Sequence, residues 1–362
     1  MSAIENAKKV PDYRIRVFLS VDLSGATAYK ASKNGAQQLE NNLYPTWVSE
    51  ISKFYKIFPG IVKKQYEFCI STPFNCKIIE DAFPKVWKFL GDEIIFSCRI
   101  LNEKHLLFCV DAFLLALLEF REYLKNNEFT KELDVKGCGW VADFPTQNQT
   151  LKVENIVSNG EELFLSEEDE IIADNKPHLF DFVGKHMDEG FRISRFSAPE
   201  KFVMSLDFCN LLSATSGELA IKFKKDLFFH SRQPLKGIYE GIEYPLFYIN
   251  TMSDESQKKL EESLKENFGI QSINGSKLSI FIIDFLKKCE ATNLSFKNNP
   301  EYYEKYKSEY NKIIDNIQKQ DDRVKNDIDS EEPVKNGSKN FRFEQEEKEH
   351  IRKIIARMKS KK

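Results

Sequence analysis

The sequence lacks several features that would assign it quickly to a class. Its seven cysteines form no Cys-x-x-Cys pair and its five histidines are widely separated, so we expect neither a disulfide framework nor a His/Cys zinc site. Most cysteines lie in apolar runs, which predicts reduced thiols in the core of a cytosolic protein. The chain also has no GxGxxG sequence and no strict βαβ periodicity, which favours an α+β fold over a doubly wound sheet.

The chain has no large excess of either charge and no long apolar segment. Its 53 Lys and Arg against 56 Asp and Glu give a net charge of −3, which argues against a dedicated nucleic-acid binder. Met1–Val10 is polar, so no signal peptide is expected. The most hydrophobic run, Leu106–Phe120, contains Asp111 and is shorter than the ~20 apolar residues of a spanning helix. We therefore expect a soluble, cytoplasmic protein that binds neither nucleic acid nor membrane.

Apolar residues make up 41% of the chain and include 30 Phe, enough for a sizeable core. Arg14–Ser20 is a short β-branched and aromatic run, which predicts a central strand buried on both faces. Val86–Leu90 and Glu93–Ile100 predict two strands joined by a tight hairpin turn, because the glycine of the intervening Gly91-Asp92 accepts a positive φ. A buried helix over Leu106–Leu124 and a strand around Val135–Ala142 follow.

Other elements are less sharply bounded in the sequence. A helical region around Gln37–Phe58 is expected to break at Pro59-Gly60, since proline and glycine both disfavour a helix interior. Phe180–Phe196 predicts a strand or turn that becomes helical after Gly184, and Phe202–Phe208 predicts a further strand. Changes of composition then divide the chain into an N-terminal tail (1–13), an α+β domain (14–250), a helical extension (251–317), a flexible polar linker (318–340) and a charged, basic-ended helix (341–362).

Two aspartates are the first candidates for chemistry. Asp22 follows the first predicted strand, and Asp92 lies at the tip of the hairpin. Side by side at the end of a sheet, their carboxylates would offer hard oxygen donors to Mg²⁺ and leave room for phosphate oxygens. The alternative is that Asp22 caps a helix and Asp92 serves its own turn.

Three further groups of residues accompany this pair. The loop Ser24, Gly25, Ala26 and Thr27 presents successive N–H groups at a helix start, where a polyphosphate could bind. Lys88 precedes Asp92 on its strand and predicts either a ligand donor or a charge that protects a sheet edge. Asp181 precedes a helix that carries Asp188 and Arg192 at i and i+4. This spacing fits a surface ion pair, or an arginine placed to stabilise phosphoryl charge.

These groups resemble the motifs of class III nucleotidyl cyclases, in the family's order. Val17–Ala28 resembles the first metal motif, and Lys88–Glu93 resembles the Lys-x-x-Gly-Asp hairpin. The positions Asp181, Asp188 and Arg192 match an Asp…Asn…Arg pattern at the family's spacing, with aspartate in place of asparagine. Leu235-Lys236-Gly237 resembles a late Lys-Gly pair. The resemblance covers Arg14–Ile249.

The resemblance implies a ferredoxin-like βαββαβ class III cyclase core with a C-terminal helical extension, and a head-to-tail homodimer with sites at its interface. Asp22 and Asp92, with the Leu23 carbonyl, would hold two divalent ions, Mg²⁺ or Mn²⁺. The partner protomer would supply Lys88 and Asp181 to the base and Arg192 to the α-phosphate. Lys236 would contact the triphosphate, and Asp188 would take the place of a ribose-aligning Asn and add charge there.

Within that family, three segments are most similar to the pyrimidine cyclases of the Pycsar antiphage defence system: Gly139-Trp140, Phe144-Pro145 and Asp188–Arg192. This similarity implies synthesis of a cyclic pyrimidine nucleotide that activates an effector during phage infection. Cytosine, uracil and adenine all present donor and acceptor groups that a Lys–Asp pair could satisfy. Donor–acceptor matching favours CTP over UTP, with ATP a further alternative.

Two alternatives belong to other classes of protein. A cyclase-fold relative without activity could serve as a binding module, although such a relative would not need Asp22, Asp92 and Arg192 together. A palm-like enzyme making dinucleotides would usually carry a GG(D/E)EF hairpin, of which Gly91-Asp92-Glu93 is only a partial match.

Overall fold

The computed structural model describes residues 9–32, 44–71, 81–154, 165–214, 227–269, 273, 275–296 and 300–330. The chain separates into two compact units, Lys8–Glu309 and a second unit formed by Met1–Ala7 with Tyr310–Lys362. The described part of the second unit is residues 310–330, the later part of helix α11 (Glu301–Ser330). All predicted site residues lie in the first unit, which is described below.

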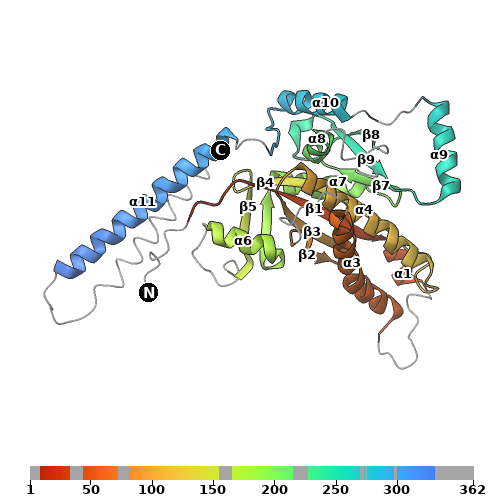
Figure 1. Cartoon of the computed structure of the whole chain (residues 1–362), viewed down its shortest axis with the longest axis horizontal. Coiled ribbons are helices and arrows are strands. Elements are labelled where there is room, and N and C mark those ends of the chain that lie inside the picture. The colour runs from red at the N-terminus through yellow and green to blue at the C-terminus, as the bar shows by residue number, and fades with distance from the viewer. Residues whose placement is uncertain are drawn as a thin grey trace. The chain divides into compact units, whose positions relative to one another are not determined.

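A mixed seven-stranded sheet in the order β2-β3-β1-β4-β7-β9-β8 forms the centre of the first unit (Figure 1). All neighbouring strands are antiparallel except β4 and β7, which are parallel. The first four strands, with the helices between them, give the βαββαβ order and antiparallel pairing of a ferredoxin-like core, so the predicted α+β class is confirmed. The strands are β1 (Arg14–Ser24), β2 (Lys85–Leu90), β3 (Glu93–Ile100), β4 (Asp134–Phe144), β7 (Lys201–Met204), β8 (Leu227–Gln233) and β9 (Tyr244–Asn250).

Helices α3 (Thr46–Ser71) and α4 (Glu103–Lys125) pack together against one face of this sheet through aromatic side chains. Phe58 of α3 lies 5.9 Å from Phe96 of β3 and 5.8 Å from Phe113 of α4, measured between ring centroids. On the opposite face, Phe18 of β1 contacts Trp140 of β4 and Phe182 of the small two-stranded sheet β5 (Asn148–Lys152) and β6 (Phe180–Gly184). Burial on both faces of β1 follows, as its sequence predicts.

The remaining helices are listed here in chain order. They are α1 (Ala26–Ala31), α6 (Glu167–Asn175), α7 (Lys185–Ile193), α8 (Leu206–Ala214), α9 (Glu255–Asn267) and α10 (Gly275–Lys288). Among the helices in the described ranges, none is long and apolar enough to cross a membrane.

Helix α3 continues through Pro59, so the predicted break at Pro59-Gly60 is wrong. A proline inside a helix removes one backbone hydrogen bond. Apolar residues nevertheless continue at helical spacing on both sides of it, and Phe54, Phe58, Val62 and Tyr66 are all at most 1% exposed. Burial of this face against α4 outweighs the local cost of the proline. The presence of Pro59 and Gly60 in the sequence gives no information about that burial. Of the region predicted as helical around Gln37–Phe58, residues 37–43 lie outside the described residues.

Other boundaries differ from the sequence prediction as well. Strand β1 continues to Ser24, past its predicted end at Ser20, so Asp22 lies within the strand and not after it. Strand β7 ends at Met204, and Phe208 belongs to α8, because a buried helix and a buried strand are equally apolar over so short a run. Helix α11 includes residues 318–330 of the stretch that we predicted as a linker. An apolar repeat reveals a helix that buries one face, but it cannot reveal a charged helix, and this stretch has no such repeat. The described helices α9, α10 and α11 occupy the region predicted as a helical extension.

Candidate active site

Asp22 and Asp92 come together at one end of the sheet. In the strand register, Asp22 of β1 is paired with Glu93 of β3 and with Lys136 of β4, so these three side chains share one face. The turn between β2 and β3 lies against the end of β1, because the Leu23 N–H donates to the Asp92 carbonyl oxygen at 3.1 Å. The Asp22 and Asp92 side chains are 30% and 29% exposed, so both remain accessible from solvent.

Each aspartate faces an ammonium group. Lys136 Nζ lies 3.0 Å from Asp22 Oδ2, and Lys30 Nζ lies 3.5 Å from Asp92 Oδ2. Burial raises the pKa of Asp22 and the nearby Asp92 raises it further, although Lys136 acts in the opposite direction. Burial likewise raises the pKa of Glu93, which accepts a hydrogen bond from Ser20 Oγ. The site therefore holds crowded carboxylates whose mutual repulsion a cation would relieve.

This donor set fits a hard divalent cation. Carboxylate oxygens are the ligands that Mg²⁺ and Mn²⁺ prefer, and in both aspartates Oδ1 has no hydrogen-bond partner within the described part of the chain. Asp22 and Asp92 are thus suited to hold metal ions, with the Leu23 carbonyl on the same stretch of β1.

The small-residue loop after Asp22 turns sharply into α1. Gly25 has φ 86°, a conformation that L side chains rarely adopt, and a Cβ there would lie 3.3 Å from the Glu132 carbonyl oxygen. The turn therefore requires glycine. Helix α1 has only six residues, so its dipole adds little to anion binding, and phosphate contacts by Ser24, Gly25, Ala26 and Thr27 stay a prediction.

Lys88 and Asp181 form an ion pair between β2 and β6. Lys88 Nζ lies 2.6 Å from Asp181 Oδ1, and the two side chains are 33% and 32% exposed. A bulge between Val86 and Lys88 turns Trp87 inward, where its Nε1–H donates to the Phe180 carbonyl at 2.9 Å. Adjacent residues of β2 thus hold adjacent residues of β6, which fixes the Lys–Asp pair at the protein surface.

Gly184 ends β6 and begins α7. Its φ is 144°, and a Cβ at this position would lie 2.6 Å from Asn148 Oδ1, so only glycine fits. On α7, Asp188 is exposed and Arg192 is half-buried.

Arg192 lies beside the Lys-Gly pair predicted to contact phosphate. A Cβ at Gly237 would be 3.9 Å from Arg192 Nη2, and Lys236 is exposed next to it. In the described residues, no ion pair within 4.0 Å joins Arg192 to Asp188, and the buried Arg192 Nε has no hydrogen-bond partner. The simple i,i+4 surface pair is therefore not formed, and phosphate binding by Arg192 and Lys236 stays a prediction.

Sequence reasoning missed two groups of residues. Lys30, Lys136 and Glu93 were not predicted as part of the carboxylate cluster; only the position of Glu93, directly after Asp92, gave a signal. The second group is Cys98, His105 and Cys109, whose ligand atoms lie within 4.8 Å of one another in the core. One histidine and two cysteines that are separated in the sequence thus converge at this point, which their spacing did not predict.

The Cys98, His105 and Cys109 group is held by the backbone. The Leu101 N–H donates to His105 Nδ1 at 3.2 Å, and His105 Nε2 lies 2.6 Å from the Ala82 carbonyl oxygen. Both ring nitrogens are therefore occupied by backbone groups, which fits a structural hydrogen-bond network better than metal ligation. All six cysteines in the described ranges are free thiols.

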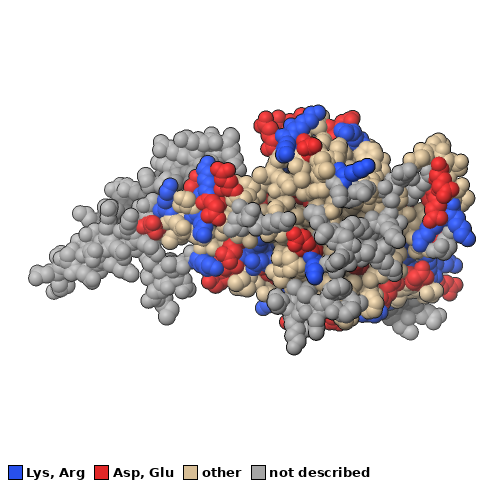
Figure 2. All heavy atoms as spheres, turned by 45° about the horizontal axis from the view of Figure 1, so that its top comes forward, with Lys and Arg blue, Asp and Glu red and all other residues tan. Residues whose placement is uncertain are grey.

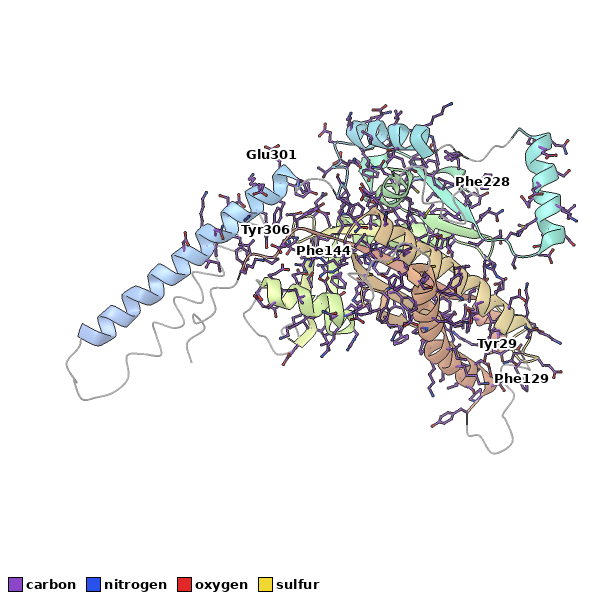
Figure 3. The ribbon with its side chains drawn as sticks, in the orientation of Figure 1. Tyr29, Phe129, Phe144, Phe228, Glu301 and Tyr306 are labelled. Atoms are coloured by element: carbon purple, nitrogen blue, oxygen red, sulfur yellow. The ribbon has the colours of Figure 1, made fainter. Side chains whose placement is uncertain are left out.

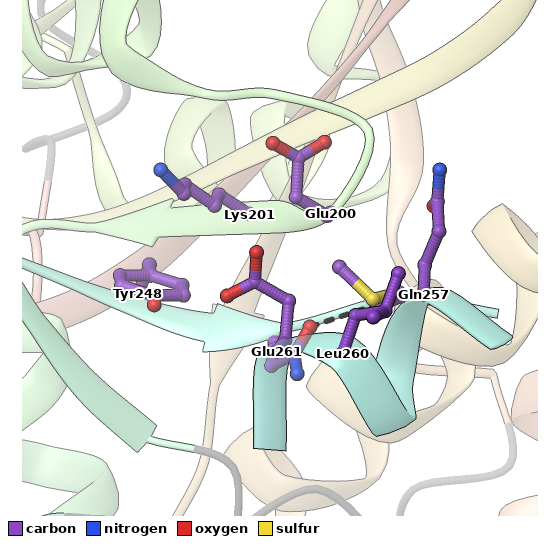
Figure 4. A pocket seen from close by; sticks show the side chains of 8 residues that line it. Glu200, Lys201, Tyr248, Gln257, Leu260 and Glu261 are labelled. Carbon is purple, nitrogen blue, oxygen red and sulfur yellow. Dashed lines mark hydrogen bonds between the residues drawn. The ribbon is translucent and has the colours of Figure 1, made fainter. Parts of the chain in front are cut away.

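Away from these residues, a hollow lies between strands β7 and β9 and helix α9 (Figure 4). It has a volume of about 400 Å³ and is lined by eight residues, including Lys201, Tyr248 and Glu261, all different from the predicted site residues. Basic and acidic side chains are interspersed over the face seen in Figure 2, consistent with the near-neutral net charge.

No known protein family and no curated protein matches this sequence. Solved structures with similar folds include the adenylyl cyclase CyaB from P. aeruginosa, at 11% identity and a TM-score of 0.42, covering 67% of this chain and 97% of that one. A bacterial light-regulated adenylyl cyclase has 10% identity and a TM-score of 0.40, covering 70% and 99%. The guanylate cyclase domain of RhGC from Catenaria anguillulae, in complex with GTP, has 10% identity and a TM-score of 0.39, covering 67% and 100%. The chemistry of this chain must follow from its own side chains.

Proposed function

We propose that this chain is a nucleotidyl cyclase that converts a nucleoside triphosphate into its 3′,5′-cyclic monophosphate and pyrophosphate. The observation that carries the proposal is the meeting of Asp22 and Asp92 at the sheet end, where the Leu23 N–H bonds to the Asp92 carbonyl. Crowded, partly exposed carboxylates at this position are suited to bind divalent cations beside a triphosphate.

In the proposed reaction, the ribose 3′-oxygen forms a bond to the α-phosphorus, and the bond from that phosphorus to the bridging oxygen breaks. Pyrophosphate leaves, and the hydroxyl proton passes to solvent. Arg192 stabilises the charge that develops on the α-phosphate, and Lys236 binds the triphosphate next to it. Asp188 orients the ribose from the same helix.

Asp22, Asp92 and the Leu23 carbonyl would hold two divalent ions, Mg²⁺ or Mn²⁺. When bound, such ions lower the pKa of the 3′-hydroxyl and stabilise the charge of the leaving pyrophosphate. Before the ions bind, Lys30 and Lys136 offset part of the repulsion between the carboxylates, since Lys30 lies 3.5 Å from Asp92 and Lys136 lies 3.0 Å from Asp22.

We further propose that Lys88 and Asp181 read the base and that the preferred substrate is CTP, which gives cyclic CMP. The cytosine amino group donates to the Asp181 carboxylate, while its ring nitrogen accepts from the Lys88 ammonium. UTP, with the roles of donor and acceptor exchanged, is the second candidate and would give cyclic UMP. The 2.6 Å contact between Lys88 and Asp181 supports a shared role in recognition.

The site is proposed to be completed by a second copy of the chain in a head-to-tail homodimer. Large apolar side chains are exposed close in sequence to the base-reading and phosphate-binding residues, with Phe89 and Phe191 47% and 40% exposed. A dimer interface would cover such side chains. Because the chain resembles the Pycsar enzymes, we propose that its product acts as a second messenger that activates an effector in bacterial antiphage defence.

The proposal is tested by incubating the purified protein with ATP, GTP, CTP and UTP, each with Mn²⁺, and identifying products by mass spectrometry. We expect cyclic CMP and pyrophosphate, and no product from Asp22→Asn or Asp92→Asn protein that remains folded. Mixing inactive Asp92→Asn with inactive Arg192→Ala protein should restore activity through one intact shared site. Unchanged turnover in either aspartate variant would exclude the metal assignment, and an inactive mixture with proven subunit exchange would exclude the shared site.

A further inference from the structure

A histidine is enclosed between two carboxylates at the start of α7. His186, which is 3% exposed, lies with Nδ1 3.3 Å from Asp143 Oδ1 of β4 and with Nε2 3.7 Å from Asp207 Oδ2 of α8. Although burial disfavours a charged ring, the hydrogen bond with Asp143 and the charge of Asp207 raise the pKa of His186. This ring therefore ties the first turn of α7 to two separate elements of the core.

The same turn is also held by an amide. Asn148 Oδ1 accepts the His186 backbone N–H at 3.1 Å, and Asn148 Nδ2 donates to the Asp143 carbonyl oxygen at 3.0 Å. Because α7 has only nine residues, the position of its first turn determines where Asp188 and Arg192 lie. The geometry of the proposed phosphate-binding helix is thus set by the buried His186 cluster, defined here as His186, Asp143 and Asp207.

In each carboxylate of the His186 cluster, the second oxygen accepts a hydrogen bond from a residue in one later stretch of the chain. We call residues 291–296 and 300–309 the C-terminal segment. Tyr302 Oη donates to Asp143 Oδ2 at 2.9 Å, and the Leu294 N–H donates to Asp207 Oδ1 at 3.0 Å. Figure 3 labels Tyr306 of α11 near Phe144, the last residue of β4, and Tyr306 and Pro145 line one common hollow. Residues far apart in sequence thus meet around one buried histidine.

We propose that the C-terminal segment is a positioning element for α7: through Tyr302 and Leu294 it fixes Asp143 and Asp207, and through them His186 and the helix that carries Arg192. Tyr302 is accordingly a positioning residue that acts without touching substrate. The effect on turnover rests on the proposed function, whereas the effect on α7 does not. Any partner that lifts this segment from the His186 cluster would lower activity without reaching the site itself.

The chain offers a matched pair of variants for the test. Tyr302→Phe removes the hydroxyl that binds Asp143, while Thr146 Oγ1 still donates to the same carboxylate oxygen at 2.9 Å. Tyr303→Phe removes the neighbouring hydroxyl, which donates at 3.0 Å to the Pro11 carbonyl, outside the His186 cluster. The two variants lose the same atom from adjacent residues of the same helical turn. Only the first is expected to loosen α7.

Hydrogen–deuterium exchange of peptides covering residues 185–193 is measured in the full-length wild type and both variants, together with kcat and KM for the preferred triphosphate. Loss of one hydrogen bond to a buried carboxylate should speed exchange in α7 roughly tenfold in Tyr302→Phe and lower kcat by a similar factor, with KM little changed. Tyr303→Phe should stay within about twofold of wild type in both measurements.

Each outcome decides between the two proposals. Unchanged exchange of α7 in Tyr302→Phe, or equal acceleration in both variants, overturns the positioning role. Faster exchange with unchanged kcat overturns its link to turnover. Faster exchange confined to Tyr302→Phe in a protein that makes no cyclic nucleotide supports the positioning role and refutes the proposed function instead.

Discussion

Replacing Gly190 by alanine should destabilise the protein, because α7 approaches β4 at this point more closely than a side chain allows. A Cβ built on Gly190 would lie 2.2 Å from Cδ2 and 2.4 Å from Cγ of Trp140. Trp140 is fully buried and stacks on Phe18 with 5.6 Å between ring centroids, so the indole has no free space into which it could move.

The magnitude follows from two opposing effects. In a helix interior, alanine is favoured over glycine by about 0.5–1 kcal/mol. Overpacking a filled core costs about 1–3 kcal/mol, and a contact this short, against a rigid ring, belongs at the upper end of that range. The net loss for Gly190→Ala is therefore about 2–2.5 kcal/mol of unfolding free energy. Because α7 must move away from the sheet, Arg192 moves as well, and turnover should fall with stability.

Gly60 provides the control, since it is an exposed residue inside α3 and a Cβ there meets nothing within 4 Å. Gly60→Ala should stabilise the protein by about 0.5–1 kcal/mol, so the same substitution has opposite signs in two helices. Urea unfolding followed by circular dichroism measures both changes. The reasoning is refuted if Gly190→Ala is as stable as wild type, or if the two variants shift the midpoint in the same direction.

Three further predictions concern charged groups. Burial raises the pKa of Asp207 to about 6, so the folded state binds this proton more tightly than the unfolded chain does, and stability should fall as pH rises from 4 to 6. Urea unfolding at pH 4.5 and 6.5 should show a smaller pH effect for Asp207→Asn, and an equal effect would contradict the burial of this charge. Arg192→Ala should lower kcat by about 10²–10³ with little change in KM. Arg195 is an exposed neighbour, and Arg195→Ala should leave kcat unchanged. A fall of only a few-fold in kcat for Arg192→Ala would contradict a transition-state role for Arg192. Lys88→Met and Asp181→Asn should each raise KM or alter the base preference with the fold intact, and unchanged substrate selectivity measured with competing triphosphates would separate this ion pair from base recognition.

Local sequence patterns were sufficient for the elements on which the site is built. The β-branched run of β1, the Gly91-Asp92 turn and the long apolar run of α4 each carry their signal within a few residues, and all three are confirmed. The same local reading placed Asp22 at the end of a strand, Asp92 in a hairpin turn and Arg192 on a helix. Motif order then predicted that they belong to one site.

Long-range pairing determined the rest. Lys136 faces Asp22 only because β4 pairs with β1 in one particular register, and a shift of one residue would turn it to the opposite face. Pro59 remains inside α3 because burial against α4 outweighs its local cost, and no local pattern measures that burial.

The His186 cluster shows the same division most clearly. Its carboxylates come from β4 and α8, and the groups that hold them come from residues 294 and 302. The sequence by itself determined the secondary structure and the residue types of the candidate site, because those depend on neighbours along the chain. Only the tertiary structure decided which charges meet, because a buried charge is stable only where folding brings its partner from a distant segment.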